Sequence, residues 1–199
     1  MEKQLLVSLG REFGSGGHKI AQRIAEEFGI SYYDRNILDH MYEGNEVLAE
    51  EMKKYDEKRA HPLLNRRVRG HSSSLEENLA MREFEFIENK ANEGESFVIV
   101  GRCGETILRE HPNHISFFVL GDMYDKICHV KERCQVDEKE AIDKIFRHDR
   151  HRKKFHNAYS DIKWGDSRGY DLCINVSRLG IEGTAELLLE YIRQRMEFF

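Results

Sequence analysis

A glycine-rich stretch near the start of the chain is the clearest candidate for chemistry. Successive backbone N–H groups in such a stretch, together with the N-terminus of a following helix, attract anionic oxygens. No carboxylate lies between Phe13 and Gln22, so no acidic side chain in the first helical turns opposes a bound phosphate. The stretch predicts a phosphate-binding loop, and a glycine-rich turn without a ligand is the alternative. The candidate residues are Arg11, Gly14, Ser15, Gly16, Gly17, His18 and Lys19.

This loop differs from the usual nucleotide-binding motif, which is Gly, four residues, then Gly-Lys-Ser/Thr. If Gly16 is the last motif glycine, Gly17 stands at the lysine position and His18 at the position of the magnesium-binding hydroxyl. Lys19 comes two residues late, and Arg11 could enter the loop from its other side. A cation for the phosphates is therefore available, but away from its usual position.

The elements around the loop alternate between strand and helix. Leu5 to Phe28 combines an apolar run, the loop and an amphipathic helix, which predicts a buried strand leading into a helix. Alternation of this kind implies right-handed crossovers and a parallel sheet. Further strands are expected near residues 30–33, 96–100, 114–120 and 170–176, and helices near 35–55 with a break at Gly44, 74–91, 123–134, 138–159 and 185–196.

The carboxyl ends of these strands should meet at one rim of the sheet. Asp34 and Arg35 follow the second strand, Arg102 follows the strand ending at Val100, and Gly121 follows the next. Open α/β sheets bind their ligands at this rim. We therefore expect these residues to lie close to the glycine-rich loop.

The chain is expected to form one domain over residues 1–199, with two segments that the sheet does not explain. One is an insertion at about residues 35–75. The other, at about residues 138–165, is dense in cations that include Arg147 and Arg150, although a solvated helix face would show the same pattern.

Composition excludes several classes of protein. The net charge of −5 argues against general nucleic-acid binding, and no stretch approaches the roughly 20 apolar residues of a membrane span. The cysteines and histidines fit none of the usual metal-ligand spacings, so no metal ligand is assigned. We expect a cytoplasmic protein without a membrane partner. Exposed aromatics such as Phe198 and Phe199 are compatible with a homodimer.

Four segments in this order resemble the cytidylate kinase-like family, a branch of the P-loop nucleoside monophosphate kinases: SLGREFGSGG, YYDRNIL, VIVGRCGETIL and KWGDSRGYDLCINVSRLGI. The resemblance covers most of the chain. It implies an α/β, three-layer P-loop kinase fold with a five-stranded parallel sheet, a monophosphate-binding insertion and a helical lid. It also implies phosphoryl transfer from ATP to CMP or dCMP, with Mg²⁺ as the metal.

The same resemblance implies roles for individual residues. The loop residues from Gly14 to Lys19 would hold the donor phosphates. Arg102 would hold the acceptor phosphate, Arg147 and Arg150 would neutralise the transferring group, and Asp34 with its neighbour Arg35 would belong to the acceptor pocket. Two alternatives remain open from the residues alone: Arg102 could pair with a helix carboxylate, and Asp34 could cap the next helix.

The sequence departs from the cytidylate kinases at two places, and four possible functions therefore remain. The lysine and hydroxyl of the loop are replaced, and Cys103 stands where the cytidylate kinases generally have aspartate. The first expectation is an ATP-dependent kinase that acts on CMP or dCMP. The alternatives are a kinase of another small phosphate acceptor, a nucleotide sensor without catalysis, and nucleic-acid binding through the basic stretches at residues 66–69 and 144–154.

Overall fold

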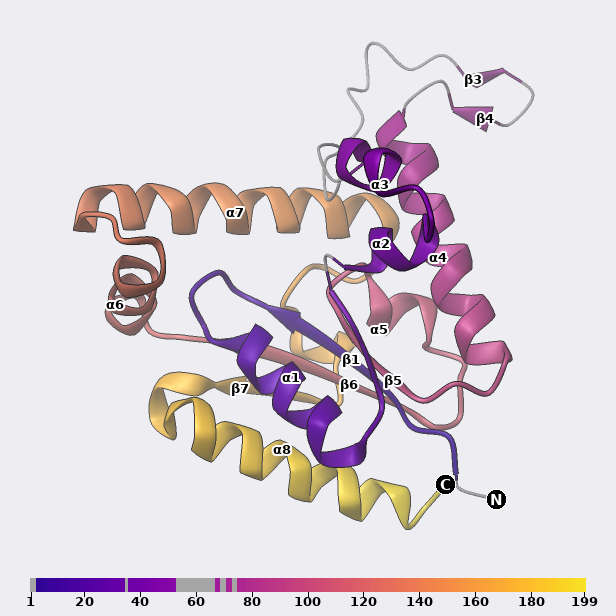
Figure 1. Ribbon diagram of the computed structural model, residues 1–199. Coiled ribbons are helices and arrows are strands. Elements are labelled where there is room, and N and C mark those ends of the chain that lie inside the picture. The colour runs from indigo at the N-terminus through magenta and orange to yellow at the C-terminus, as the bar shows by residue number, and fades with distance from the viewer. Residues whose placement is uncertain (1–2, 35, 53–66, 69–70, 73–74) are drawn as a thin grey trace.

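The computed structural model describes residues 3–34, 36–52, 67–68, 71–72 and 75–199, and within them strands and helices alternate (Figure 1). The elements in chain order are β1 (Leu6–Arg11), α1 (Gly17–Phe28), β2 (Ser31–Tyr33), α2 (Ile37–Met41), α3 (Glu46–Met52), β3 (Arg67–Val68), β4 (His71–Ser72), α4 (Leu75–Asn92), β5 (Phe97–Val100), α5 (Gly104–Ile107), β6 (His114–Leu120), α6 (Met123–Cys134), α7 (Glu138–Tyr159), η1 (Ser167–Gly169), β7 (Leu172–Asn175), η2 (Val176–Arg178) and α8 (Gly180–Met196).

Five strands form one sheet in the order β2-β5-β1-β6-β7, and every neighbouring pair is parallel. The central strand β1 lies between β5 and β6 and is buried along its whole length. Continuous apolar runs such as that of β5 suit a sheet covered on both faces. The predicted α/β fold with a five-stranded parallel sheet is therefore confirmed.

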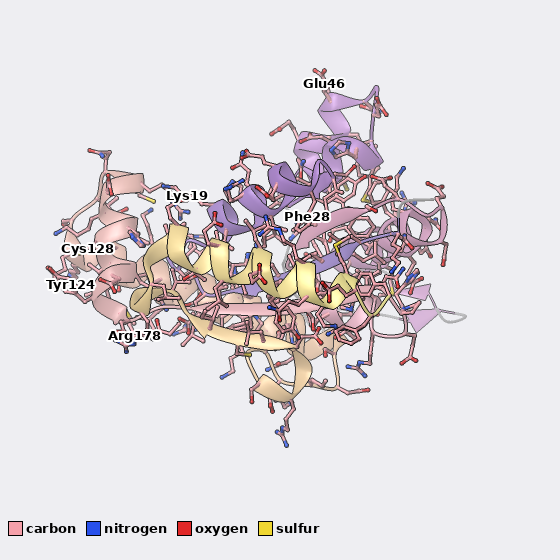
Figure 2. The ribbon with its side chains drawn as sticks, turned by 90° about the horizontal axis from the view of Figure 1, so that it is seen from below. Lys19, Phe28, Glu46, Tyr124, Cys128 and Arg178 are labelled. Carbon is pink, nitrogen blue, oxygen red and sulfur yellow. The ribbon has the colours of Figure 1, made fainter. Side chains whose placement is uncertain are left out.

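Helices cover both faces of the sheet, which gives three layers (Figure 1). On one face, α1 and α8 pack their apolar sides against alternate residues of the strands, and Figure 2 shows α8 lying across this face. On the other face, α2, α4 and α5 bury the remaining strand residues. Because successive strand residues point to opposite faces, the two cores use different residues of the same strands.

The helical segment after β2 is broken at Gly44, as predicted. It is divided into α2 and α3, and Gly44 between them has a positive φ of 84°. Positive φ ends a helix at little cost when the residue is glycine. The serines expected to cap α4, Ser73 and Ser74, lie outside the described residues, as do residues 35, 53–66 and 69–70 of the predicted insertion.

Helix α7 spans 22 residues, as predicted, and begins with Asp137 accepting a hydrogen bond from the Glu140 N–H. Such a side-chain acceptor satisfies one of the unpaired donors of the first turn. Together with α6, α7 lies beyond the carboxyl edge of the sheet, where β1 ends (Figure 1). Within the described part of the chain, no helix has both the length and the apolar composition that crossing a membrane requires.

His114 at the start of β6 is a buried titratable group in this core. Its Nε2 lies 2.8 Å from Ser8 Oγ on β1, and burial lowers the pKa of His114 to about 4. The unfolded chain gains a proton on this histidine near pH 6.5, whereas the folded chain does not until about pH 4. His114 therefore contributes to the free energy of unfolding above pH 6.5, and this contribution is lost as the pH falls from 6.5 toward 4.

We predict that His114 alone removes about 2 kcal/mol from the free energy of unfolding between pH 7 and pH 5. The variant His114→Gln keeps a polar group beside Ser8 but cannot titrate, so its stability should fall less over the same range. Urea unfolding at both pH values measures the difference. An identical loss in the variant and the unmodified protein would show that His114 does not cause it.

Candidate functional site

The glycine-rich loop between β1 and α1 is held by close contacts that require glycine. Gly14 and Gly16 have φ values of 87° and 83°, and a Cβ on Gly14 would lie 2.9 Å from the carbonyl oxygen of Lys126. The Ser15 hydroxyl donates a hydrogen bond to the carbonyl of Glu12, which fixes the turn from inside. The loop conformation therefore depends on two glycines, Gly14 and Gly16, which the sequence places on either side of Ser15.

Helix α1 begins at Gly17 with its N-terminus toward a cleft of about 570 Å³. The N-cap residue is Gly16, so no capping side chain hydrogen-bonds to the N–H groups of the first turn. That turn also contains no acidic residue. The helix dipole and the first-turn N–H groups thus favour an anion there. The cleft is lined by Arg11, Glu12, Phe13, Gly14, Gly16, Gly17, His18, Lys19, Asp34, His129, Glu132, Arg133, His148, Arg152 and Ile181.

Arg11 and Asp34 form an ion pair at the carboxyl ends of β1 and β2. Arg11 is 8% exposed, and its Nη2 lies 3.4 Å from Asp34 Oδ1. The other carboxylate oxygen of Asp34 lies 2.8 Å from His18 Nδ1, and the Tyr32 hydroxyl contacts both. Burial alone would raise the pKa of Asp34, but the His18 hydrogen bond and the charges of Arg11 and Arg102 outweigh it and lower that pKa well below its usual value. Asp34 is thus an anion that holds two cleft residues in place.

Arg102 lies after β5 in a strained turn. Gly101, Arg102 and Cys103 have φ values of 78°, 56° and 54°, a run of left-handed residues in which two are not glycine. Each non-glycine residue in this region costs on the order of 1 kcal/mol or more, and such strain gathers at functional sites. Arg102 is 1% exposed, and its Nε lies 3.2 Å from Glu83 Oε1 on α4. The helix-carboxylate pairing that the sequence left open is therefore present.

A second, small cavity of about 20 Å³ adjoins Arg102, with room for about one water molecule. Arg11 and Arg152 line both this cavity and the large cleft. Three guanidinium-bearing residues thus border one small space between β1, β5 and α7. The full lining is Gly10, Arg11, Gly101, Arg102, Cys103, Glu105, Arg152, Phe155, His156, Trp164 and Tyr170.

Helix α7 presents one face to the loop. The His148 ring stacks on Phe13 with centroids 4.2 Å apart, and the Asp149 carboxylate accepts a 2.6 Å hydrogen bond from the Phe13 N–H. One turn later, Arg152 Nη1 donates to the carbonyl of Arg11. The same helix face therefore brings an imidazole, a carboxylate and a guanidinium to the loop.

Lys126 ties α6, α7 and the loop together. It is 4% exposed, and its Nζ donates to Glu12 Oε2 at 2.9 Å and to Asp149 Oδ2 at 3.2 Å. Burial raises the pKa of Asp149, while the Phe13 N–H and Lys126 act in the opposite direction. The loop is thereby held by a charge network around a buried lysine, with two partly buried carboxylates, rather than by apolar packing alone.

The structure brings most of the predicted loop residues together. Glycines 14, 16 and 17, together with His18 and Lys19, border the cleft with Arg11 and Asp34, and Lys19 is exposed at the loop end of α1 (Figure 2). Ser15 instead borders a separate cavity of about 200 Å³ on the side of α6 and η2. Arg35 lies outside the described residues. The Asp34 side chain faces the cleft and does not cap α2.

Arg147 and Arg150, the two lid arginines expected from the sequence, are exposed and do not line the cleft. Arg152 is the α7 arginine that does, and the sequence analysis did not select it. The sequence did contain a signal for Arg152. The buried face of α7 is marked by Ala141, Ile145 and Phe155, and the helical repeat places Arg152 on the same side of the helix. The sequence analysis also missed seven other residues that line the cleft: Glu12, Phe13, His129, Glu132, Arg133, His148 and Ile181.

Comparisons with known proteins agree on family and fold. Residues 6–178 match the sequence model of the cytidylate kinase-like family. An uncharacterized protein from Eubacterium ventriosum has a similar solved structure, with 38% identity, a TM-score of 0.77, and coverage of 96% of this chain and 99% of that one. No curated protein matches the chain.

Two shikimate kinases share the fold at 14% identity each. The enzyme from Bacteroides thetaiotaomicron has a TM-score of 0.55 and covers 95% of this chain and 98% of its own. The enzyme from Acinetobacter baumannii, solved in complex with shikimate, has a TM-score of 0.52 and covers 97% and 95%. Identity this low concerns the architecture alone, so these structures identify a P-loop kinase fold and no substrate.

We predict that Lys126→Met lowers the free energy of unfolding by about 2 kcal/mol, because it leaves two partly buried carboxylates, Glu12 and Asp149, without their shared cation. Lys131→Met on the exposed side of the same helix is the matched control and should stay within about 0.5 kcal/mol of the unmodified protein. Urea unfolding at pH 7 measures both. Equal stability of the two variants would mean that the charge network does not hold the loop.

Proposed function

The chain belongs to the cytidylate kinase-like family, and on that premise we propose that it transfers the γ-phosphoryl group of ATP to a nucleoside monophosphate, with CMP or dCMP as the acceptor. Family and fold support phosphoryl transfer in general terms. One observation carries the finer proposal: Arg11 and Arg152 line both the cleft over the glycine-rich loop and the small cavity beside Arg102. A group moving between the two spaces passes these guanidinium groups.

The cleft suits the donor phosphates. The N-terminus of α1 faces it without an acidic side chain in the first turn, and Arg11, Lys19, Arg133 and Arg152 add positive charge. The cavity of about 200 Å³ on the other side of the loop shares Gly14, His129 and Ile181 with the cleft. We assign the nucleoside part of ATP to that side, so that the phosphates extend along the loop toward Arg11.

The small cavity suits the acceptor phosphate by charge but not by size. Guanidinium groups bind phosphate oxygens two at a time, and three of them border this space. At about 20 Å³ the cavity is too small for a phosphate, so acceptor binding must move α7 or the segment carrying Trp164 outward. When the site closes again over the bound acceptor, the same segment would shield the transferring group from water.

In this reaction the acceptor phosphate oxygen forms a bond to the γ-phosphorus while the bond from that phosphorus to the β–γ bridging oxygen breaks, and ADP leaves. Catalysis depends on alignment and on positive charge around the three equatorial oxygens. In this proposal Arg11 and Arg152 supply that charge, and Arg102 orients the acceptor. Asp34 holds Arg11 and His18 in position.

The residues present fit a Mg²⁺ that arrives with the nucleotide. Among the described residues, no three His, Cys, Asp or Glu side chains gather into a metal cage. The carboxylates lining the cleft are Glu12, Asp34 and Glu132, and Asp34 is paired with Arg11 and His18. Mg²⁺ commonly keeps several waters and binds substrate phosphates with one or two carboxylates nearby. When bound, it neutralises phosphate charge, and Asp34 would hold one of its waters.

The altered loop favours one second candidate, a nucleotide sensor without catalysis. Gly17 and His18 occupy the positions of the motif lysine and hydroxyl, and both of those groups ordinarily contact the phosphates or the metal. A sensor would bind ATP and close α7 without turnover. Titration of ATP against thermal stability, beside a coupled assay for ADP formation with CMP, dCMP, UMP, AMP and small alcohols, separates the two. Binding without ADP formation favours the sensor, and the absence of both contradicts the proposal.

We predict that Arg152→Ala lowers kcat by about 100-fold, the usual loss when one group stabilising transition-state charge is removed. Lys153→Ala, exposed one residue further along α7, is the matched control and should keep its rate. Initial rates with ATP and the best acceptor measure the effect, with thermal midpoints checked alongside. If Arg147→Ala or Arg150→Ala abolishes turnover while Arg152→Ala does not, the assignment of the lid arginines from the sequence is right and the assignment to Arg152 is wrong.

A further inference from the structure

Gly17 has no room for a side chain, although its backbone would accept one. Its φ is not among the positive values, so any L-residue could adopt this conformation. A Cβ built on Gly17 would lie 2.7 Å from Arg11 Cβ and 2.7 Å from Val119 Cγ2. Carbon atoms that are not bonded prefer separations of about 3.5–4.0 Å. The space beside Gly17 is therefore taken by the stem of Arg11 and by its neighbour on β6.

The two positions are the ends of the same turn. Arg11 is the last residue of β1 and pairs in register with Val119 on β6, whereas Gly17 is the first residue of α1. A lysine at position 17 would begin within 2.7 Å of the point where the Arg11 side chain begins. Arginine is at least as long as lysine, so a guanidinium that starts at this point is long enough to reach the region that a lysine ammonium would reach.

The guanidinium of Arg11 is also held in a functional orientation. Asp34 binds its Nη2, and Arg152 binds its backbone carbonyl, so both the head and the root of the residue are fixed. Its side chain borders the cleft and the small cavity at once. The motif lysine supplies a cation at the β- and γ-phosphates of the nucleotide, and a guanidinium held in this cleft could supply the same charge.

We propose that Arg11 replaces the lysine of the phosphate-binding loop, and that Gly17 is glycine because the Arg11 side chain occupies the space of that lysine. The inference rests on one part of the proposed function, the binding of ATP phosphates at this loop. It assigns the contact with the terminal phosphates to a strand residue instead of the first helical residue. The loop thereby keeps a fixed cation although its motif lysine is replaced.

The first test is the affinity for ATP with Mg²⁺, measured by calorimetry on the full chain. Arg11→Met keeps an unbranched stem beside Gly17 and removes the guanidinium, so the Kd for ATP should rise about 10- to 100-fold, as expected for a lost hydrogen bond to a charged group. Arg23→Met, on the solvent side of α1, is the matched control and should bind as the unmodified protein does. A change of less than about twofold in Arg11→Met overturns the proposal.

The second test moves the cation back to its usual position. Room for a lysine at position 17 requires removal of both obstructing groups, so the series is built on Val119→Ala. Three proteins are compared: Val119→Ala, Arg11→Gly/Val119→Ala, and Arg11→Gly/Gly17→Lys/Val119→Ala. The second should bind ATP at least about 10-fold more weakly than the first, and the third should recover most of that loss.

The outcomes separate this inference from the function on which it rests. If the unmodified protein binds no ATP, the proposed function fails first. If it binds ATP, and the lysine variant fails to recover affinity while circular dichroism and thermal midpoints show that it is folded, the equivalence of Arg11 with the motif lysine is wrong. Recovery in the lysine variant but not in a matched Arg11→Gly/Gly17→Met/Val119→Ala protein shows that charge at this point is what matters.

Discussion

The site depends on burying several guanidinium groups close together without leaving their charges uncompensated. Positive charges of like sign in a partly desolvated space repel each other, and an unpaired buried charge costs several kcal/mol. Here Arg11 has Asp34 and Arg102 has Glu83. Asp34 directly follows β2 and Glu83 lies on α4, so the charge balance is set by the fold. The strained turn at Arg102 is tolerable for the same reason, because Glu83 holds the side chain that the turn directs inward.

A second charge network links the loop to α7, the helix that would have to move during a catalytic cycle. Lys126 bridges Glu12 and Asp149, and Asp149 also accepts the Phe13 N–H. Any outward movement of α7 must break these contacts or carry the loop with it. We therefore expect ligand binding at the loop to be coupled to the position of α7, since the Asp149 carboxylate on α7 hydrogen-bonds to the loop.

Most of the fold was predictable from local patterns, whereas the partners within the site were not. Apolar runs at β1, β5 and β6 and the glycine-rich loop defined the sheet and its rim, and Asp34 was expected there from strand order. The pairing of Arg102 with Glu83 joins residues far apart in sequence, so it remained one of two alternatives. On α7, cation density drew attention to exposed arginines, although helical phase identifies Arg152. The strained turn after β5 has no signature in residue type, since two of its three residues are not glycine.

The proposed function depends on an anion site for nucleotide phosphates, which the loop between β1 and α1 would form together with Arg11. The most direct measurement is the titration of ATP and Mg²⁺ into the isotope-labelled full chain, followed by NMR of the backbone amides and the arginine Nε–H groups. We predict saturable shifts at Gly14, Gly16, Gly17 and His18 and at the Nε–H of Arg11. Unchanged signals at these groups at millimolar ATP, in a chain that remains folded, would contradict it.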